Sequence, residues 1–263
     1  MPKIKSWGIL ALVISPIIVT FSGWKLAKAQ LTPELLISVE FPKANRPESS
    51  QTYSGGTRSL DCLTEKANQE KKKLRVLMPM PLEKKELPES TYYLISGTTI
   101  STNPKFFVYL PEHTAESAEF VIKENSGESD TKTEFKISGS SGIVKLTLPE
   151  KVNLEANKEY TWSFSIVCNP DERSLDLFVQ GTIKKVEISS DLENKLENAT
   201  TPLEKAKIYA EAGIWYDMIA TVADLHASDH AKWKEEWTEL LRSVELKDYI
   251  VSAPFASCCE LKQ

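Results

Sequence analysis

Two of the three histidines stand four residues apart, which is a spacing that can place two ligands on one metal ion. On a continuous helix His226 and His230 would share a face and bind a divalent cation. The glutamate of the zinc-protease pattern is missing between them, and Ser228 is placed to interrupt the helix. Asp224 or Asp229 would add a carboxylate oxygen. We favour the competing interpretation, a solvated pair on a loop.

The best candidate for a serine nucleophile also lacks the groups that would activate it. Ser140 and Ser141 precede Gly142, but such an enzyme needs a base and an oxyanion hole. The segment 139–142 fits a hairpin turn better. The sequence has no phosphate-cradling glycine loop, no His-Glu-x-x-His and no strand-borne Gly-x-Ser-x-Gly. We therefore expect no enzymatic activity, no cofactor and no metal.

Four cysteines allow three complete pairings. A bond between the neighbours Cys258 and Cys259 would need a strained ring. Our first choice is a disulfide between Cys62 and Cys168, which would close a loop of more than a hundred residues. The alternative is that all four stay reduced, with Cys168 packed as a small apolar residue. The sequence leaves open whether Cys258 or Cys259 pairs with anything.

Residues 1–29 have the pattern of a secretory signal peptide. Lys3 and Lys5 make its start positive, an apolar run covers residues 9–21, and an Ala-Lys-Ala tripeptide ends at Ala29. We expect cleavage between Ala29 and Gln30. The alternative is a membrane anchor, but a span needs about 20 apolar residues. The prediction is an exported protein, periplasmic or extracellular, with no membrane span after cleavage.

The net negative charge of the chain argues against nucleic acid as a partner. The formal charge of −5 becomes −9 when the signal peptide is removed, because that segment holds four lysines and no acid. An acidic surface does not favour nucleic acid, whose binding depends on lysine and arginine at the phosphates. We expect another envelope protein as the partner and no nucleic acid. The sequence does not set the oligomeric state.

Changes in pattern divide the remaining chain into three parts. Residues 30–57 are rich in polar residues and proline, which predicts a flexible tether. Residues 58–190 contain seven or eight short alternating runs separated by turn signals, typical of an antiparallel immunoglobulin-like β-sandwich. In the clearest run one strand face carries five buried candidates: Tyr160, Trp162, Phe164, Ile166 and Cys168.

Residues 191–263 change to helical spacing and form a predicted helical cap. Thr201 and Pro202 give an N-cap with proline in the first turn, and Gly213 is placed to end that helix. Apolar stripes then run through 215–225 and 233–244. The predicted class is mostly β with α.

Five aromatic residues form a possible interaction surface. Three lie opposite the aliphatic positions of their strands and two lie in the helical stripes: Phe107, Tyr109, Phe178, Trp215 and Trp237. If exposed, they would make a platform for a sugar or a protein. The alternative, which we favour, puts the strand aromatics beneath the helices.

Several stretches together resemble one known family. They are FFVYLP at 106–111, YTWSFSIVCNP at 160–170 and YAEAGIWYD at 209–217. The chain is similar, over about 55–249, to a cyanobacterial family called domain of unknown function 928 (DUF928). The resemblance implies an exported protein with no assigned catalytic residues.

The helical end also resembles one tetratricopeptide repeat. Ala206, Tyr209, Gly213 and Val222 fall at the spacing of that pattern, whereas Met218 stands where a small residue is usual. A lone repeat cannot bury its own face, so a cap on the sandwich is favoured over a peptide-binding array.

These observations predict an exported envelope protein of unknown molecular function, acting as a non-enzymatic protein-interaction module. The alternatives are a carbohydrate-binding module that uses exposed aromatics and a divergent envelope hydrolase.

Overall fold

The structure is a computed structural model that describes residues 38–45, 52–54, 62–79, 91–93, 95–127, 130–149, 152–256 and 259–261. All of them lie in one compact unit from Ser38 to Gln263. The predicted signal peptide, with its cleavage between Ala29 and Gln30, lies outside the described residues. Within the described part of the chain, no helix has the length and apolar character needed to cross a membrane.

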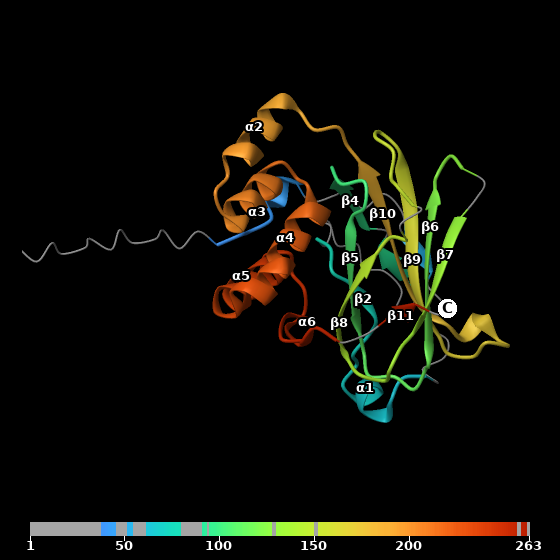
Figure 1. Cartoon of the computed structure of the whole chain (residues 1–263). Helices are drawn as coiled ribbons and strands as arrows, with labels where there is room; N and C mark the ends of the chain where they lie inside the picture. The colour runs from blue at the N-terminus through green and yellow to red at the C-terminus, as the bar shows by residue number, and fades with distance from the viewer. Residues whose placement is uncertain are drawn as a thin grey trace, which may run out of the picture. The chain divides into compact units, whose positions relative to one another are not determined.

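Two β-sheets and a set of helices make this a mixed α/β fold (Figure 1). Strands β1 (Thr52–Ser54) and β3 (Thr91–Tyr93) form a separate antiparallel pair. The smaller main sheet has the order β2 (Arg75–Val76), β5 (Lys105–Leu110), β8 (Gly142–Thr147). The larger has the order β11 (Glu260–Leu261), β7 (Asp130–Lys136), β6 (Ser117–Glu124), β9 (Glu159–Val167), β10 (Leu177–Lys185), β4 (Ile95–Thr99).

Alternation of side chains determines which face of β9 is buried. Four alternate residues of β9 are buried, and those between them are half-buried. A period of two places one strand face in a core. The prediction for this strand is confirmed at Tyr160, Trp162, Phe164 and Ile166. Cys168 lies just after the strand and is half-buried.

The two main sheets face each other across an aromatic core. The Phe106 ring of β5 has its centroid 5.0 Å from Phe120 of β6 and 5.1 Å from Trp162 of β9. All three side chains are buried. Tyr216 from the helical region joins them, with its ring centroid 5.3 Å from Phe106. A helix residue therefore completes the core between the sheets.

Two connections differ from the predicted antiparallel arrangement. Strand β4 pairs with β10 in parallel, from Ile95↔Gly181 to Thr99↔Lys185. The predicted hairpin at 139–142 is wrong, because β7 pairs with β6 in one sheet and β8 pairs with β5 in the other. The chain therefore crosses between sheets at this point. Neither the β4–β10 pair nor the β5–β8 pair is joined by a tight turn, which is the local signal that identifies hairpins.

The helical region follows the predicted capping residues closely. Thr201 caps α3 with a reciprocal bond to Glu204, and Gly213 follows that helix with a φ of 73°. Helix α4 ends at Ser228, the residue expected to interrupt the helix, and the next residue, Asp229, caps α5 (His230–Ser243) by accepting from the Lys232 N–H. The helices are α1 (Glu65–Gln69), α2 (Ser190–Asn198), α3 (Pro202–Glu211), α4 (Trp215–Ser228), α5 (His230–Ser243) and α6 (Asp248–Val251).

Helices α4 to α6 cover the outer face of the smaller sheet. The Trp237 ring of α5 lies 5.9 Å from Phe107, and the Tyr249 ring of α6 lies 5.2 Å from Tyr109. Figure 1 shows helices α2 to α6 together on the side of β4 and β5, away from β6 and β7. The predicted division into 58–190 and 191–263 falls beside the start of α2 and stays a prediction.

A disulfide joins Cys62 to Cys168 across a sequence separation of 106, with the Cα atoms 5.2 Å apart. This confirms the first-choice pairing. It ties the chain just before α1 to the end of β9. No described cysteine is a free thiol, and Cys258 lies outside the described residues.

Residues 38–45, inside the predicted tether, are packed against the helices. Val39 and Phe41 are buried, and the Phe41 ring meets Trp215 edge-on at 5.2 Å. The Val39 N–H donates to Glu236 Oε2 at 2.9 Å. Asn45 Nδ2 donates to the carbonyl of Ala210 at 2.9 Å. We call residues 38–45 the N-terminal strap. The composition of this segment did not indicate its packing, because only two of its apolar side chains, Val39 and Phe41, are buried and the other contacts are hydrogen bonds.

Candidate functional site

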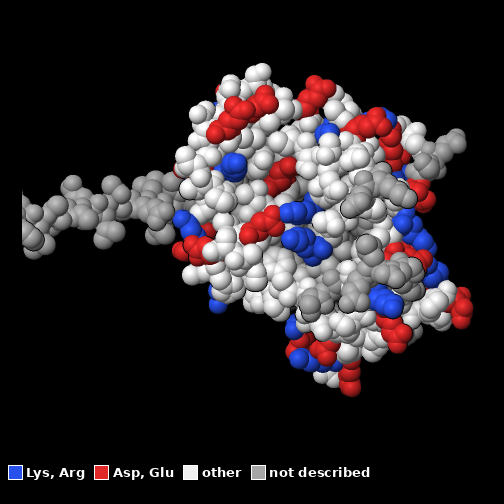
Figure 2. Space-filling model, in the orientation of Figure 1, with Lys and Arg blue, Asp and Glu red and all other residues white. Residues whose placement is uncertain are grey.

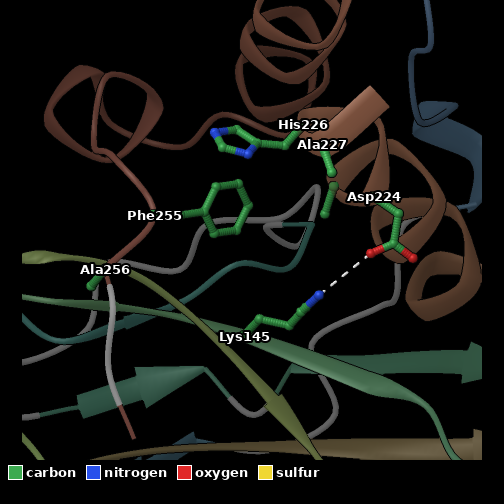
Figure 3. Close-up of a pocket in the computed structure, with 7 residues that line it drawn as sticks. Lys145, Asp224, His226, Ala227, Phe255 and Ala256 are labelled. Carbon is green, nitrogen blue, oxygen red and sulfur yellow. Dashed lines mark hydrogen bonds and ion pairs between the residues drawn. The ribbon is translucent and has the colours of Figure 1, made fainter. Parts of the chain in front are cut away.

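A hollow of about 350 Å³ lies between the end of α4, strand β8 and the segment after α6 (Figure 3). Helix α4 places successive turns along one wall, β8 forms the floor, and Phe255 closes the far side. The wall is partly apolar and partly charged. Its lining residues are Lys145, Ala223, Asp224, His226, Ala227, Phe255 and Ala256.

Two charged side chains that line the hollow, Lys145 and Asp224, form a cluster with the neighbouring Lys105. Asp224 accepts from Lys105 Nζ at 2.5 Å and from Lys145 Nζ at 3.5 Å. In the β5–β8 register Lys145 lies opposite Phe107, two residues from Lys105, so both lysines share the face covered by the helices. The three side chains are 31–49% exposed. Exposed ion pairs of this kind contribute only about 0–1 kcal/mol to stability.

An aromatic stack forms the other side. The His226 ring lies 4.4 Å from Trp233 and 5.4 Å from Phe255, both nearly edge-on. Trp233 and Phe255 in turn contact Trp237, at 6.1 Å and 5.3 Å. The hollow is therefore walled by rings that already pack on one another, with the imidazole exposed at its rim.

The predicted histidine pair is brought together at this rim. The ring centroids of His226 and His230 lie 5.0 Å apart, one at the end of α4 and one at the start of α5. Asp224 contacts the two lysines, and Asp229 caps α5. Among the described residues no group of three or more metal-ligating side chains is placed to hold a metal ion.

The proposed aromatic platform is wrong for four of its five residues, which are buried: Phe107, Tyr109, Trp215 and Trp237. Phe107 and Tyr109 lie beneath the helices, as the favoured alternative predicted. Phe178 is half-buried and pairs with Ser165 on the other face of the larger sheet, so it does not lie beneath them. Packing these rings against one another is favourable because it removes their apolar surface from water.

The two carboxyl groups whose pKa is raised, those of Asp217 and Glu236, lie outside the hollow in structural contacts. Burial raises the pKa of Asp217, although its carboxylate accepts from the Thr99 hydroxyl at 2.6 Å and the Ile100 N–H at 3.1 Å. Burial also raises the pKa of Glu236, which holds Val39. Each carboxyl group accepts hydrogen bonds that connect its helix to another segment of the same chain: Asp217 connects α4 to residues 99–100, and Glu236 connects α5 to Val39.

Sequence reasoning missed the roles of Lys105, Lys145 and Phe255. Lys105 and Lys145 alternate with the buried Phe107 and Ile143 on one strand face, which is a weak local signal. Their meeting with Asp224 depends on contacts 119 and 79 residues apart in sequence. Phe255 lies in a short bridge to Ile143 that has no periodic pattern.

Comparison with known proteins places most of the two main sheets, together with helices α1 to α6, in one family. The family described as Domain of Unknown Function (DUF928) matches residues 53–255. The match includes β5, β9 and α4, which carry the stretches that resembled this family. Curated proteins give no match. The chain belongs to the DUF928 family.

Proposed function

We propose that this DUF928 protein is exported and works by binding another envelope protein, without enzymatic activity. The observation that carries the proposal is the hollow beside β8, with its ion cluster on one side and its aromatic wall on the other. Such a mixture of apolar surface and a few convergent polar groups is typical of binding sites. Periplasm and extracellular space are the compartments that fit.

Two features support export. The signal-peptide pattern ends at Ala29, and a disulfide such as Cys62–Cys168 persists in oxidising compartments. N-terminal sequencing of the protein from its native cell should begin at Gln30. A mature protein that still begins at Met1 and needs detergent for extraction would contradict export.

Binding of a protein is favoured over carbohydrate stacking because four of the five candidate aromatic side chains are buried. Among the described residues only Ile188 is a large exposed apolar side chain. Figure 2 shows basic and acidic side chains intermingled on one face, with neither sign in a large field. This pattern fits a protein contact made at a small site and does not suggest attachment to a polyanion.

Photo-cross-linking in the native cell tests the proposal. A benzophenone side chain in place of Ala227, at the hollow, should capture a specific neighbouring protein. The same group in place of Ala156, an exposed alanine in the turn before β9, is the matched control. Capture at both positions or at neither would contradict a binding role for the hollow. A glycan adduct would favour the carbohydrate-binding alternative, and polymer hydrolysis abolished by Asp224→Asn would favour the hydrolase.

We also propose that the two main sheets form an immunoglobulin-like sandwich and that the helical region contains a tetratricopeptide-like hairpin. The two facing sheets support an immunoglobulin-like sandwich, apart from the parallel β4–β10 pair. The α3–α4 pair supports a tetratricopeptide-like hairpin, with Ala206 and Val222 buried. A cyanobacterial source agrees with the family resemblance.

A further inference from the structure

The outer edge of β8 presents backbone groups that the described chain leaves open. The Ile143 N–H donates to the Pro254 carbonyl at 2.8 Å, and its carbonyl accepts from the Ala256 N–H at 2.9 Å. Backbone groups of alternate strand residues point to the same side. Those of Lys145 and Thr147 therefore point away from β5, as Ile143 does. No described strand pairs with them, because the bridge to Phe255 involves Ile143 alone.

The hollow lies beside this open edge. An added strand would place the side chain opposite Lys145 on the same face as Lys145. That face is the one covered by the helices, and there Lys145 points from β8 toward Asp224 (Figure 3). One residue of an added strand would therefore direct its side chain into the hollow.

The charges in the hollow select the kind of side chain. Two lysines share a single aspartate, so the cluster has a net charge of +1. Lys105 holds Asp224 at 2.5 Å, whereas Lys145 is 3.5 Å away and its side chain is 44% exposed. Lys145 is therefore the cation that an incoming carboxylate would meet. Opposite charges directly across two strands stabilise the pairing.

An extended peptide fits these features better than an acidic glycan. A peptide uses both the backbone edge and the lysine, whereas a glycan would use the lysine and an open ring face. The rings at the wall are already occupied, since His226 lies 4.4 Å from Trp233 and Phe255 lies 5.8 Å from it. Strand addition of this type is a recurring mode of peptide recognition.

We propose that β8 binds an extended segment of a partner protein as an added strand, with a glutamate or aspartate of that segment beside Lys145. This inference rests on the proposed function and gives it a docking edge and a partner chemistry. The segment would lie beside β8 as a fourth strand of the smaller sheet and pair with Lys145 and Thr147. It would lie on the side of β8 where residues 254–256 already pair with Ile143.

A displayed library of eight-residue linear peptides, selected on the full chain, tests the proposal. Selected peptides should carry one acidic residue among β-branched residues. Lys145→Glu should weaken their binding at least tenfold, measured by fluorescence anisotropy. Thr147→Pro should do the same, because it removes an outward N–H and leaves the bonds to β5 intact. Lys184→Glu, at an exposed lysine of β10, is the matched control and should leave binding within twofold.

Amide hydrogen exchange of the unmodified chain gives an independent measurement if a variant fails to fold. Exchange at Lys145 and Thr147 should slow when the best peptide binds, and a peptide N-methylated at alternate residues should not slow it. The proposal is overturned if peptides with glutamine in place of the acid bind equally well. It is also overturned if exchange at these two amides is unchanged.

Two further outcomes separate this inference from the proposed function. If Thr147→Pro leaves the cross-link from position 227 to a partner protein intact, strand addition is wrong and the protein-binding role stands. If polygalacturonate binds in a way that Lys145→Glu abolishes and Thr147→Pro does not change, the hollow belongs to an acidic glycan. Both proposals then fall.

Discussion

One hydroxyl group connects the helical region to the core between the sheets. The Trp162 indole donates to the Tyr216 hydroxyl at 2.7 Å, and that hydroxyl donates to the Thr182 carbonyl at 3.1 Å. Glycine is needed beside both rings. A Cβ at Gly97 would come within 2.8 Å of Tyr216, and one at Gly181 within 2.9 Å of Trp162. The two stretches YTWSFS and GIWYD thus meet at one buried hydrogen bond.

Tyr216→Phe should lower the free energy of unfolding by about 1–3 kcal/mol, because it leaves a buried indole N–H without its acceptor. Urea denaturation measures the change. Tyr249→Phe is the control, since the Tyr249 hydroxyl is buried and has no hydrogen-bond partner among the described residues. That variant should be neutral or slightly stabilising. Equal losses in both variants would contradict the role given to Tyr216.

His113 should make stability fall as the solution is acidified. Burial lowers the pKa of His113 from its ordinary 6.5, so the unfolded chain binds a proton that the folded chain does not. Stability is therefore lost as the pH falls from about 6.5 toward the folded pKa. Thermal denaturation at pH 7.5 and 5.5 measures the effect. His113→Leu should show a smaller loss between these two values.

Asp217 acts in the opposite direction. Burial raises the pKa of its carboxyl group above 3.8, so the folded chain binds the proton first and gains stability as the pH falls through that range. The unmodified protein and the His113→Leu variant both contain Asp217. Subtracting the variant's dependence of stability on pH from that of the unmodified protein therefore removes the contribution of Asp217. An identical pH profile for the two proteins would contradict the assignment to His113.

At the scale of elements, the helices α4 to α6 act as a cover that the smaller sheet needs. Phe107 and Tyr109 are buried only because Trp237 and Tyr249 lie over them. Exposing one large aromatic side chain lowers the free energy of unfolding by about 1.5–3 kcal/mol. The whole free energy of unfolding of a domain is only about 5–15 kcal/mol.

Residues 55–190 expressed alone should therefore unfold or aggregate. Size-exclusion chromatography and thermal denaturation measure this, with the full chain as the control. A monomer that melts at the temperature of the full chain would show that the helices are dispensable for the sheets. The helical region would then be free to serve a partner with its apolar face.

Local patterns predicted elements better than pairings. The alternation through Trp162 identified β9 and its buried face, and Thr201 and Gly213 marked the ends of α3. These signals depend on neighbours in sequence. The parallel β4–β10 pair and the hollow depend on segments about 80 or more residues apart, such as Lys145 and Asp224, and no local pattern encodes such contacts.

At the scale of the whole molecule, the Cys62–Cys168 bond closes a loop of more than a hundred residues that includes strands of both main sheets. Loop-closure entropy predicts that replacing both cysteines with serine lowers stability by about 4–5 kcal/mol. Urea denaturation of the oxidised protein and the double variant measures the difference. Quantitative alkylation of both thiols in unreduced protein from the native cell would contradict the bond.

The N-terminal strap sets the order in which the protein can finish folding. Val39 bonds to Glu236 and Phe41 to Ser243, at sequence separations of 197 and 202. A ribosome or a translocation channel that delivers the chain from its N-terminus releases the strap long before α5. Because contacts between distant residues form slowly, the strap must wait for nearly the whole domain to emerge. The last step of folding therefore waits until α5 has emerged, which is compatible with the export proposed above.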